Sequence, residues 1–440
     1  MSKIGLKIRW LSLDLHRFQR LTKEGGWILF GQIVSVLGAL VLVRVLTEYL
    51  DPAAYGELAL GLTIAGLVNQ VVTGGVTAGI GRFYSIAAEK GDLSGYLQAS
   101  RKLMGFAILA IGVIALALMA GLIWTNQTQW LSLTAAVLVF SVLTGLNSSL
   151  SGVQNAARQR SIVALHSGMD AWLKIGLAVG VMLWLGTSST AVVIGYTLSA
   201  MFVSLSQLHF LRRLLRLQDK KGSNPVSEKW CSQMWAYSWP FSAWGVFTWL
   251  QLSSDRWALE SFATTQEVGQ YVVVFQLGYT PIVLVTGLMT SFLGPILYQR
   301  SGVATDNNRN VSVHHLAWRI TGLSLICTAL AFLFTLVLHD WLFLLLVAEP
   351  FRASSHYLPW VVLAGGLFAA GQMLALKLMS EMKIGTMTSA KITTALIGIL
   401  CNILGAWLFG LAGVVAGLLV FSCLYFGWFV SLARKLPSQF

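Results

Sequence analysis

The sequence predicts an all-α membrane protein that crosses the bilayer about twelve times. Of its 440 residues, 56% are hydrophobic and only 11% are charged, and the mean hydropathy is +0.71. Soluble domains usually carry about 25% charged residues, so most of this surface is expected to face lipid. The long apolar runs and the distribution of Lys and Arg along the chain predict the same fold class.

Twelve runs are long and apolar enough to cross the hydrocarbon core, which takes about 20 residues of helix. The first 26 residues are polar and basic, with apolar side chains spaced as one face of an amphipathic helix, which we expect to lie on the membrane surface. The predicted spans are 27–49, 56–80, 103–124, 131–153, 165–185, 190–210, 236–257, 268–297, 318–338, 358–378, 387–409 and 411–431.

The basic residues orient these spans. If the N-terminus is cytoplasmic, all but four of the 30 Lys and Arg residues lie in the tails or inner loops, as the positive-inside rule requires. Both termini are therefore expected in the cytoplasm. The same rule explains the excess of basic over acidic residues, 30 to 17, without nucleic-acid binding. The exceptions are Arg44, Lys174, Arg256 and Arg352.

A pattern of apolar run, Arg, Glu, Gly and apolar run occurs once in each half of the chain. It spans residues 44–56 and, one residue longer, 256–269, with Glu48 and Glu260 each four residues after the Arg. We interpret the recurrence as a parallel internal duplication, because six spans intervene. Two halves that rock against each other around a central site are typical of transporters.

The duplication and the charged linker define the predicted domains. We expect two six-helix lobes around a central cavity, joined by a basic cytoplasmic linker. The predicted parts are an N-terminal segment at 1–26, an N-lobe at 27–210, the linker at 211–235, a C-lobe at 236–431 and a cytoplasmic tail at 432–440.

Several stretches occur in an order and at span positions that point to one family. They are RVLTEYLDPAAYGELAL at 44–60, GRFYSIAAEKGDL at 81–93, SSDRWAL at 253–259, VGQYVVVFQL at 268–277 and NILGAWLFGLAGVVAGLLV at 402–420. With them the chain resembles the polysaccharide-transporter, or O-antigen-type oligosaccharide-lipid flippase, family of the multidrug/oligosaccharidyl-lipid/polysaccharide (MOP) exporter superfamily. The resemblance implies a MATE/MOP-like fold and a lipid-linked oligosaccharide as cargo.

A polyprenyl-pyrophosphate-linked sugar requires cations and hydrogen bonds at membrane depth. A buried charge costs about 2.5 to 3.5 kcal/mol on insertion scales, so each needs a reason. Lys174, Asp170 and His166 share one face of the fifth span at i, i+4 spacing. Lys174 is a candidate for binding anionic cargo; the alternative is an ion pair that lowers the insertion cost. Asp170 and His166 are candidates for proton or sodium coupling.

Arg44 and Arg256 are the second group of candidates, because the duplication makes them equivalent. Paired across the lobes, they would frame one anion site, and arginine suits phosphate through its bidentate donors. The alternative for each is snorkelling to the interface, helped by Glu48 or Glu260. Asp255, beside Arg256, is a candidate for an ion pair or for coupling.

Three further basic residues, Arg82, Lys377 and Lys391, lie near span ends. They are secondary candidates for substrate binding, with a role as topology anchors as the alternative.

Two other functions are weighed against a flippase. A cation-coupled multidrug exporter of the same fold would need buried carboxylates, and few acids fall inside the predicted spans. A polytopic glycan polymerase or ligase would need a sizeable external loop. The four isolated cysteines show no metal or disulfide spacing, and we expect no catalytic residue, no metal and no cofactor. An ion that drives transport remains an open alternative.

The expected location is the bacterial inner membrane. The expected partners are the lipid-linked oligosaccharide and the bilayer, with glycan polymerase and chain-length proteins as further candidates.

Overall fold

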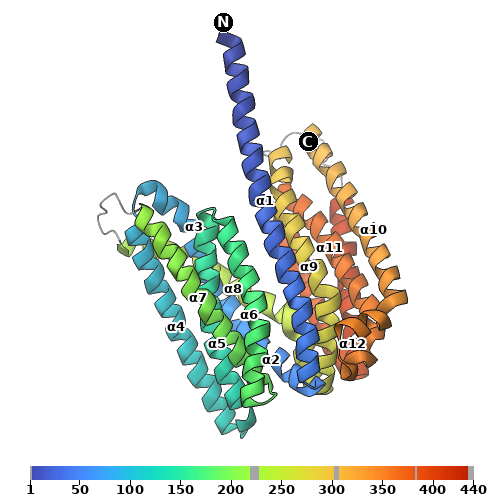
Figure 1. Ribbon diagram of the computed structural model, residues 1–440. Helices are drawn as coiled ribbons and strands as arrows, with labels where there is room; N and C mark the ends of the chain where they lie inside the picture. The colour runs from blue at the N-terminus through green and yellow to red at the C-terminus, as the bar shows by residue number, and fades with distance from the viewer. Residues whose placement is uncertain (1, 219–226, 302–306, 382–383, 435–440) are drawn as a thin grey trace. The chain divides into compact units, whose positions relative to one another are not determined.

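The computed structural model describes residues 2–218, 227–301, 307–381 and 384–434, and these contain no β-strand (Figure 1). Ten of the described helical segments are long and apolar enough to cross a membrane. We count two more crossings: α8 (Ser227–Phe262), which carries more polar residues, and the second half of α12 (Ile384–Arg434). The all-α, multi-pass fold class is confirmed.

The remaining elements follow the predicted order of spans. The second span combines α2, a five-residue π-helix and α3. The elements are α1 (Ser2–Tyr49), α2 (Pro52–Val68), the π-helix (Asn69–Thr73), α3 (Gly74–Lys90), α4 (Leu93–Trp124), α5 (Leu131–Ala156), α6 (Arg160–Leu185), α7 (Ser189–Gln218), α9 (Thr265–Ser301), α10 (Asn307–Leu346) and α11 (Leu358–Ser380), with short 3-10 turns at Thr128–Trp130 and Glu349–Tyr357.

The predicted N-terminal segment and the predicted linker are both largely helical where the structure describes them. Helix α1 runs from Ser2 through the first predicted span without a break. Within the predicted linker 211–235, α7 continues to Gln218 and α8 begins at Ser227, whereas residues 219–226 lie outside the described part. The tail from 435 onward also lies outside it.

The chain forms two compact units that are not two consecutive segments. Unit 1 comprises residues 1–42 and 64–247, and unit 2 comprises 43–63 and 248–440. The segment 43–63 belongs to unit 2 because its polar side chains bond there. Tyr55 donates to Gln276 Oε1 (2.7 Å), and Trp257 Nε1 donates to Thr63 Oγ1 (2.9 Å). The lobe boundaries expected from the sequence stay a prediction.

The break between the last two predicted spans is confirmed at Gly410. This residue has φ 56° and ψ −133° inside α12, a left-handed conformation that glycine adopts without a Cβ clash. The amide of Leu411, which begins the final helix segment, donates to Glu267 Oε2 (2.8 Å). That bond satisfies one of the donors left open at a helix N-terminus.

The duplicated stretches meet in unit 2 through their glycines. Helix α2 starts at Pro52 after Asp51, whose carboxylate accepts from Ala54 N (2.7 Å) as an N-cap. A Cβ on Gly56 would overlap the carbonyl oxygen of Thr265, and a Cβ on Gly269 would overlap that of Pro52. The contact is thus reciprocal, and the backbones of α2 and α9 touch where small residues permit it.

The reciprocal crossing gives a testable prediction. Gly269→Ala should lower the stability of the full chain by about 1 to 3 kcal/mol, because the added methyl group forces two backbones apart. Gly322→Ala is the matched control, since a Cβ there meets nothing within 4 Å. Thermal unfolding in detergent measures both, and equal melting temperatures for the two variants would contradict the crossing.

Candidate functional site

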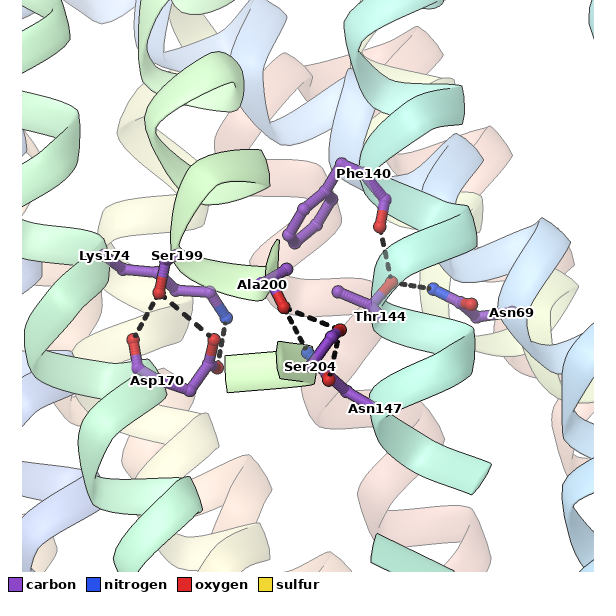
Figure 2. A network of polar contacts seen from close by, with 9 residues as sticks. All are labelled: Asn69, Phe140, Thr144, Asn147, Asp170, Lys174, Ser199, Ala200 and Ser204. Atoms are coloured by element: carbon purple, nitrogen blue, oxygen red, sulfur yellow. Dashed lines mark hydrogen bonds and ion pairs between the residues drawn. The ribbon is translucent and has the colours of Figure 1, made fainter. Parts of the chain in front are cut away.

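Lys174 and Asp170 form an ion pair on α6. Lys174 Nζ lies 2.6 Å from Asp170 Oδ2 (Figure 2), and the two side chains are 20% and 31% exposed. The lysine ammonium also lies over the rings of Phe140 and Tyr196, at 5.6 and 5.7 Å from their centroids. The positive charge of Lys174 is therefore stabilised by one ion pair and two cation–π contacts.

A polar cavity of about 230 Å³ lies in unit 1 among α5, α6 and α7. Asp170 and His166 line it, whereas Lys174 does not. The lining residues are Thr144, Asn147, Ser148, Ser151, His166, Ser167, Asp170, Val203 and Gln207.

Hydrogen bonds between helices hold the walls of this cavity. Asn147 Nδ2 donates to Ala200 O (3.0 Å), and Ser204 Oγ donates to Asn147 Oδ1 (2.6 Å), which joins α5 to α7 (Figure 2). Asn69 Nδ2 donates to Thr144 Oγ1 (2.9 Å) and joins the π-helix to α5. These hydrogen bonds hold the side chains of Asn147 and Thr144 in place.

His166 is buried at 1% exposure and has both ring nitrogens occupied. Nδ1 lies 2.8 Å from the carbonyl oxygen of Ile162, and Nε2 lies 3.0 Å from Ser206 Oγ. A donating Nδ1 and an accepting Nε2 satisfy both contacts with a neutral ring. The side chain packs edge-on against Phe210.

Asp255 and Arg256 lie side by side in unit 2 with different partners. Asp255 is 5% exposed and accepts hydrogen bonds from Tyr271 OH (2.7 Å) and from the backbone amide of Arg256 (2.8 Å). The guanidinium of Arg256 lies over the ring of Phe275, 5.5 Å from its centroid. Its Nε is buried and has no hydrogen-bond partner among the described residues.

Arg44 differs from Arg256 in its partner. Arg44 pairs with Glu48 at 3.1 Å, with 38% and 59% of the two side chains exposed, whereas Glu260 accepts from Thr265 Oγ1 (3.1 Å). The Nη1 atom of Arg44 is buried without a partner in the described part of the chain. Both arginines belong to unit 2.

The three secondary candidates lie in different surroundings. Lys377 is fully buried, with its Nζ 2.7 Å from Glu381 Oε1 and 3.3 Å from Ala433 O. Arg82 is exposed and Lys391 is half-buried. The structure thus pairs Lys174 with Asp170 and places Asp170 and His166 in the lining of one cavity. The roles of all these candidates in binding or coupling stay predictions.

Several lining residues are not among the candidates predicted from the sequence, Gln207, Ser151 and Ser167 among them. The polar positions of α5 recur every three or four residues, and those of α6 lie at 166, 167 and 170. This spacing places them on one helix face. A search for polar stripes rather than for charges would have found the cavity.

The fold is shared with solved membrane transporters. Lipid II flippase MurJ in an inward closed conformation matches with a TM-score of 0.66 and 11% identity, over 94% of this chain and 88% of that chain. An inward-facing MATE multidrug transporter of the MOP superfamily matches at 0.59 and 14%, over 92% and 96%. A MOP transporter from Pyrococcus furiosus, described as having a binding pocket of reverse polarity, matches at 0.56 and 15%, over 96% of both chains.

The class defined by these matches is a multi-pass membrane protein with the MOP exporter fold. A family model described as polysaccharide biosynthesis protein matches residues 21–300 of this chain. The chain belongs to that family, so the resemblance seen in the sequence is confirmed. A search of curated protein sequences found no match.

The buried pair at Lys377 gives a second prediction. Lys377→Met should destabilise the protein by about 3 to 5 kcal/mol, because the Glu381 carboxylate would lose its cation while only 3% of its side chain is exposed. The double variant Lys377→Met with Glu381→Leu should recover most of the loss. Thermal unfolding in detergent tests this, and a double variant no more stable than the single one would contradict the pairing.

Proposed function

We propose that the protein is a flippase that carries a polyprenyl-pyrophosphate-linked oligosaccharide from the inner to the outer leaflet of the bacterial inner membrane. The cargo serves surface polysaccharide synthesis, as O-antigen, capsule or exopolysaccharide. The observation that carries the proposal is membership of the polysaccharide biosynthesis protein family over residues 21–300. The MOP exporter fold is compatible with alternating access, in which two lobes open to each side in turn.

Unpartnered arginine atoms support an anionic cargo. Arg44 Nη1 and Arg256 Nε are buried donors without partners in the described residues. A donor without a partner is costly in a membrane, and a pyrophosphate oxygen would satisfy it. We assign these two residues to the pyrophosphate, with Arg82, Lys377 and Lys391 as secondary candidates.

Lys174 has a different role in this proposal. Its ammonium is already compensated by Asp170 and two aromatic rings, so anionic cargo would have to compete with that carboxylate. We therefore assign Lys174 to neutralising Asp170 in the resting state and to sharing its charge with cargo during transport. Asp170, His166 and Asp255 are the groups through which a proton or sodium gradient would drive the cycle.

Membrane orientation and partners complete the proposal. The positive-inside bias favours both termini in the cytoplasm. Glycan polymerase and chain-length proteins would receive the translocated cargo. A multidrug exporter is the competing function, supported by the MATE fold, but the carboxylates of Asp170 and Asp255 already accept hydrogen bonds from the protein.

Alanine variants at the cationic positions test the proposal. Arg44→Ala and Arg256→Ala should each lower surface-glycan display by roughly 10- to 100-fold, the effect of losing a charge-assisted hydrogen bond, and Lys174→Ala should lower it less. Arg256→Lys should retain part of the activity because it keeps the charge. Quantitative immunoblotting of surface glycan, normalised to membrane-inserted protein, measures the effect.

The control is Arg101→Ala, because this arginine is exposed on α4 and is assigned no role in binding. Normal surface-glycan display in all three alanine variants would contradict the proposed cation sites. If the alanine variants lost resistance to cationic drugs but kept normal glycan display, that result would favour a multidrug exporter.

A further inference from the structure

The cavity of unit 1 contains a buried acceptor that the protein leaves unused. Gln207 is 2% exposed and lines the cavity from α7. Its Nε2 donates to Ser151 Oγ (3.1 Å), but its Oε1 is buried with no hydrogen-bond partner among the described residues. Leaving such an acceptor without a donor is costly in a low-dielectric interior, and a ligand hydroxyl in the cavity would supply one.

The negative charge in the cavity wall is balanced inside the protein. Asp170 provides the carboxylate, but Lys174 neutralises it from outside the lining at 2.6 Å. Two carboxylate oxygens offer about four acceptor positions, so Asp170 still accepts hydrogen bonds after pairing with Lys174. The walls therefore recognise a neutral ligand with several hydroxyl groups.

Size and wall chemistry narrow the ligand further. The volume of about 230 Å³ lies below the roughly 300 to 1,000 Å³ of pockets that hold drug-sized ligands, which suits a single sugar ring. Hydroxyls of Ser148, Ser151 and Ser167 both donate and accept, as sugar hydroxyls do. Val203 is the only apolar residue in the described lining, so recognition depends on hydrogen bonds.

We propose that this cavity is a subsite for one neutral sugar residue of the cargo glycan, with Gln207 Oε1 and Asp170 accepting hydrogen bonds from its hydroxyl or amide groups. The inference rests on the proposed function. It separates cargo recognition into two kinds of contact: neutral hydrogen bonds to the sugar in unit 1, and guanidinium donors for the pyrophosphate in unit 2.

Saturation-transfer NMR on the full chain in detergent micelles tests the subsite. The probes are glucose, galactose, N-acetylglucosamine and rhamnose, each presented with the wild-type protein and its variants. At least one sugar should give a saturable signal with the wild type, and Gln207→Leu should weaken its binding by about fivefold or more, as expected for one hydrogen bond. Ser151→Ala, which removes the group that orients Gln207, should weaken it in the same direction.

Gln154→Leu is the matched control, because Gln154 is also fully buried in unit 1 but does not line the cavity. It should bind sugar as the wild type does. The subsite is overturned if none of the four sugars binds, if Gln207→Leu binds as well as the wild type, or if Gln154→Leu loses binding equally.

The two proposals fail in different ways. If no sugar bound but surface-glycan display still required Arg44 and Arg256, the subsite proposal would be contradicted and the flippase proposal would stand. If surface-glycan display were unchanged after disruption of the gene, the flippase proposal would be contradicted, whatever the result of the sugar-binding experiment.

Discussion

The bilayer core offers no water, so every polar group at membrane depth must find its partner inside the protein. Hydroxyl side chains do so within their own helices, as Thr286 and Thr328 donate to carbonyl oxygens four residues earlier. Charged groups do so in pairs, at Lys174 with Asp170 and at Lys377 with Glu381. An unpaired group is a candidate for contact with a ligand where its residue also lines a cavity.

Buried polar atoms without a partner among the described residues occur in both units, as donors and as acceptors. One of those in unit 1, Gln207 Oε1, belongs to a residue that lines the same cavity as Asp170. Unit 2 leaves guanidinium donors on Arg44 and Arg256. A lipid-linked glycan has both a neutral polyhydroxyl part and an anionic link, and the two proposals assign the first to Gln207 and the second to these two arginines.

The duplicated stretches combine a shared contact with divergent surroundings. Gly56 and Gly269 make the same close approach to each other's helix, which a duplicated backbone would provide. The arginines that precede them have different partners: Arg44 pairs with Glu48, while Arg256 lies over Phe275. At equivalent positions of the two stretches, the arginine therefore has a carboxylate partner in one and an aromatic partner in the other.

Span number, the break at Gly410 and the shared helix face of Lys174, Asp170 and His166 follow from the sequence, because hydropathy and helical spacing are local properties. The assignment of 43–63 to unit 2 does not, since it depends on contacts such as Tyr55 with Gln276 between distant segments. Nor do the ring contacts of Lys174, because helical spacing places it on the face of Asp170 without showing that Phe140 and Tyr196 lie against its ammonium.

The central claim, that this chain moves lipid-linked glycan between leaflets, is tested most directly by locating the glycan after gene disruption. Inverted and right-side-out membrane vesicles can be probed with a membrane-impermeant lectin or glycosidase specific for the repeat unit. We expect lipid-linked repeat units to accumulate on the cytoplasmic face and to disappear from the outer face, with recovery when the intact gene is restored. Repeat units that still reach the outer face in the disrupted strain would contradict the account.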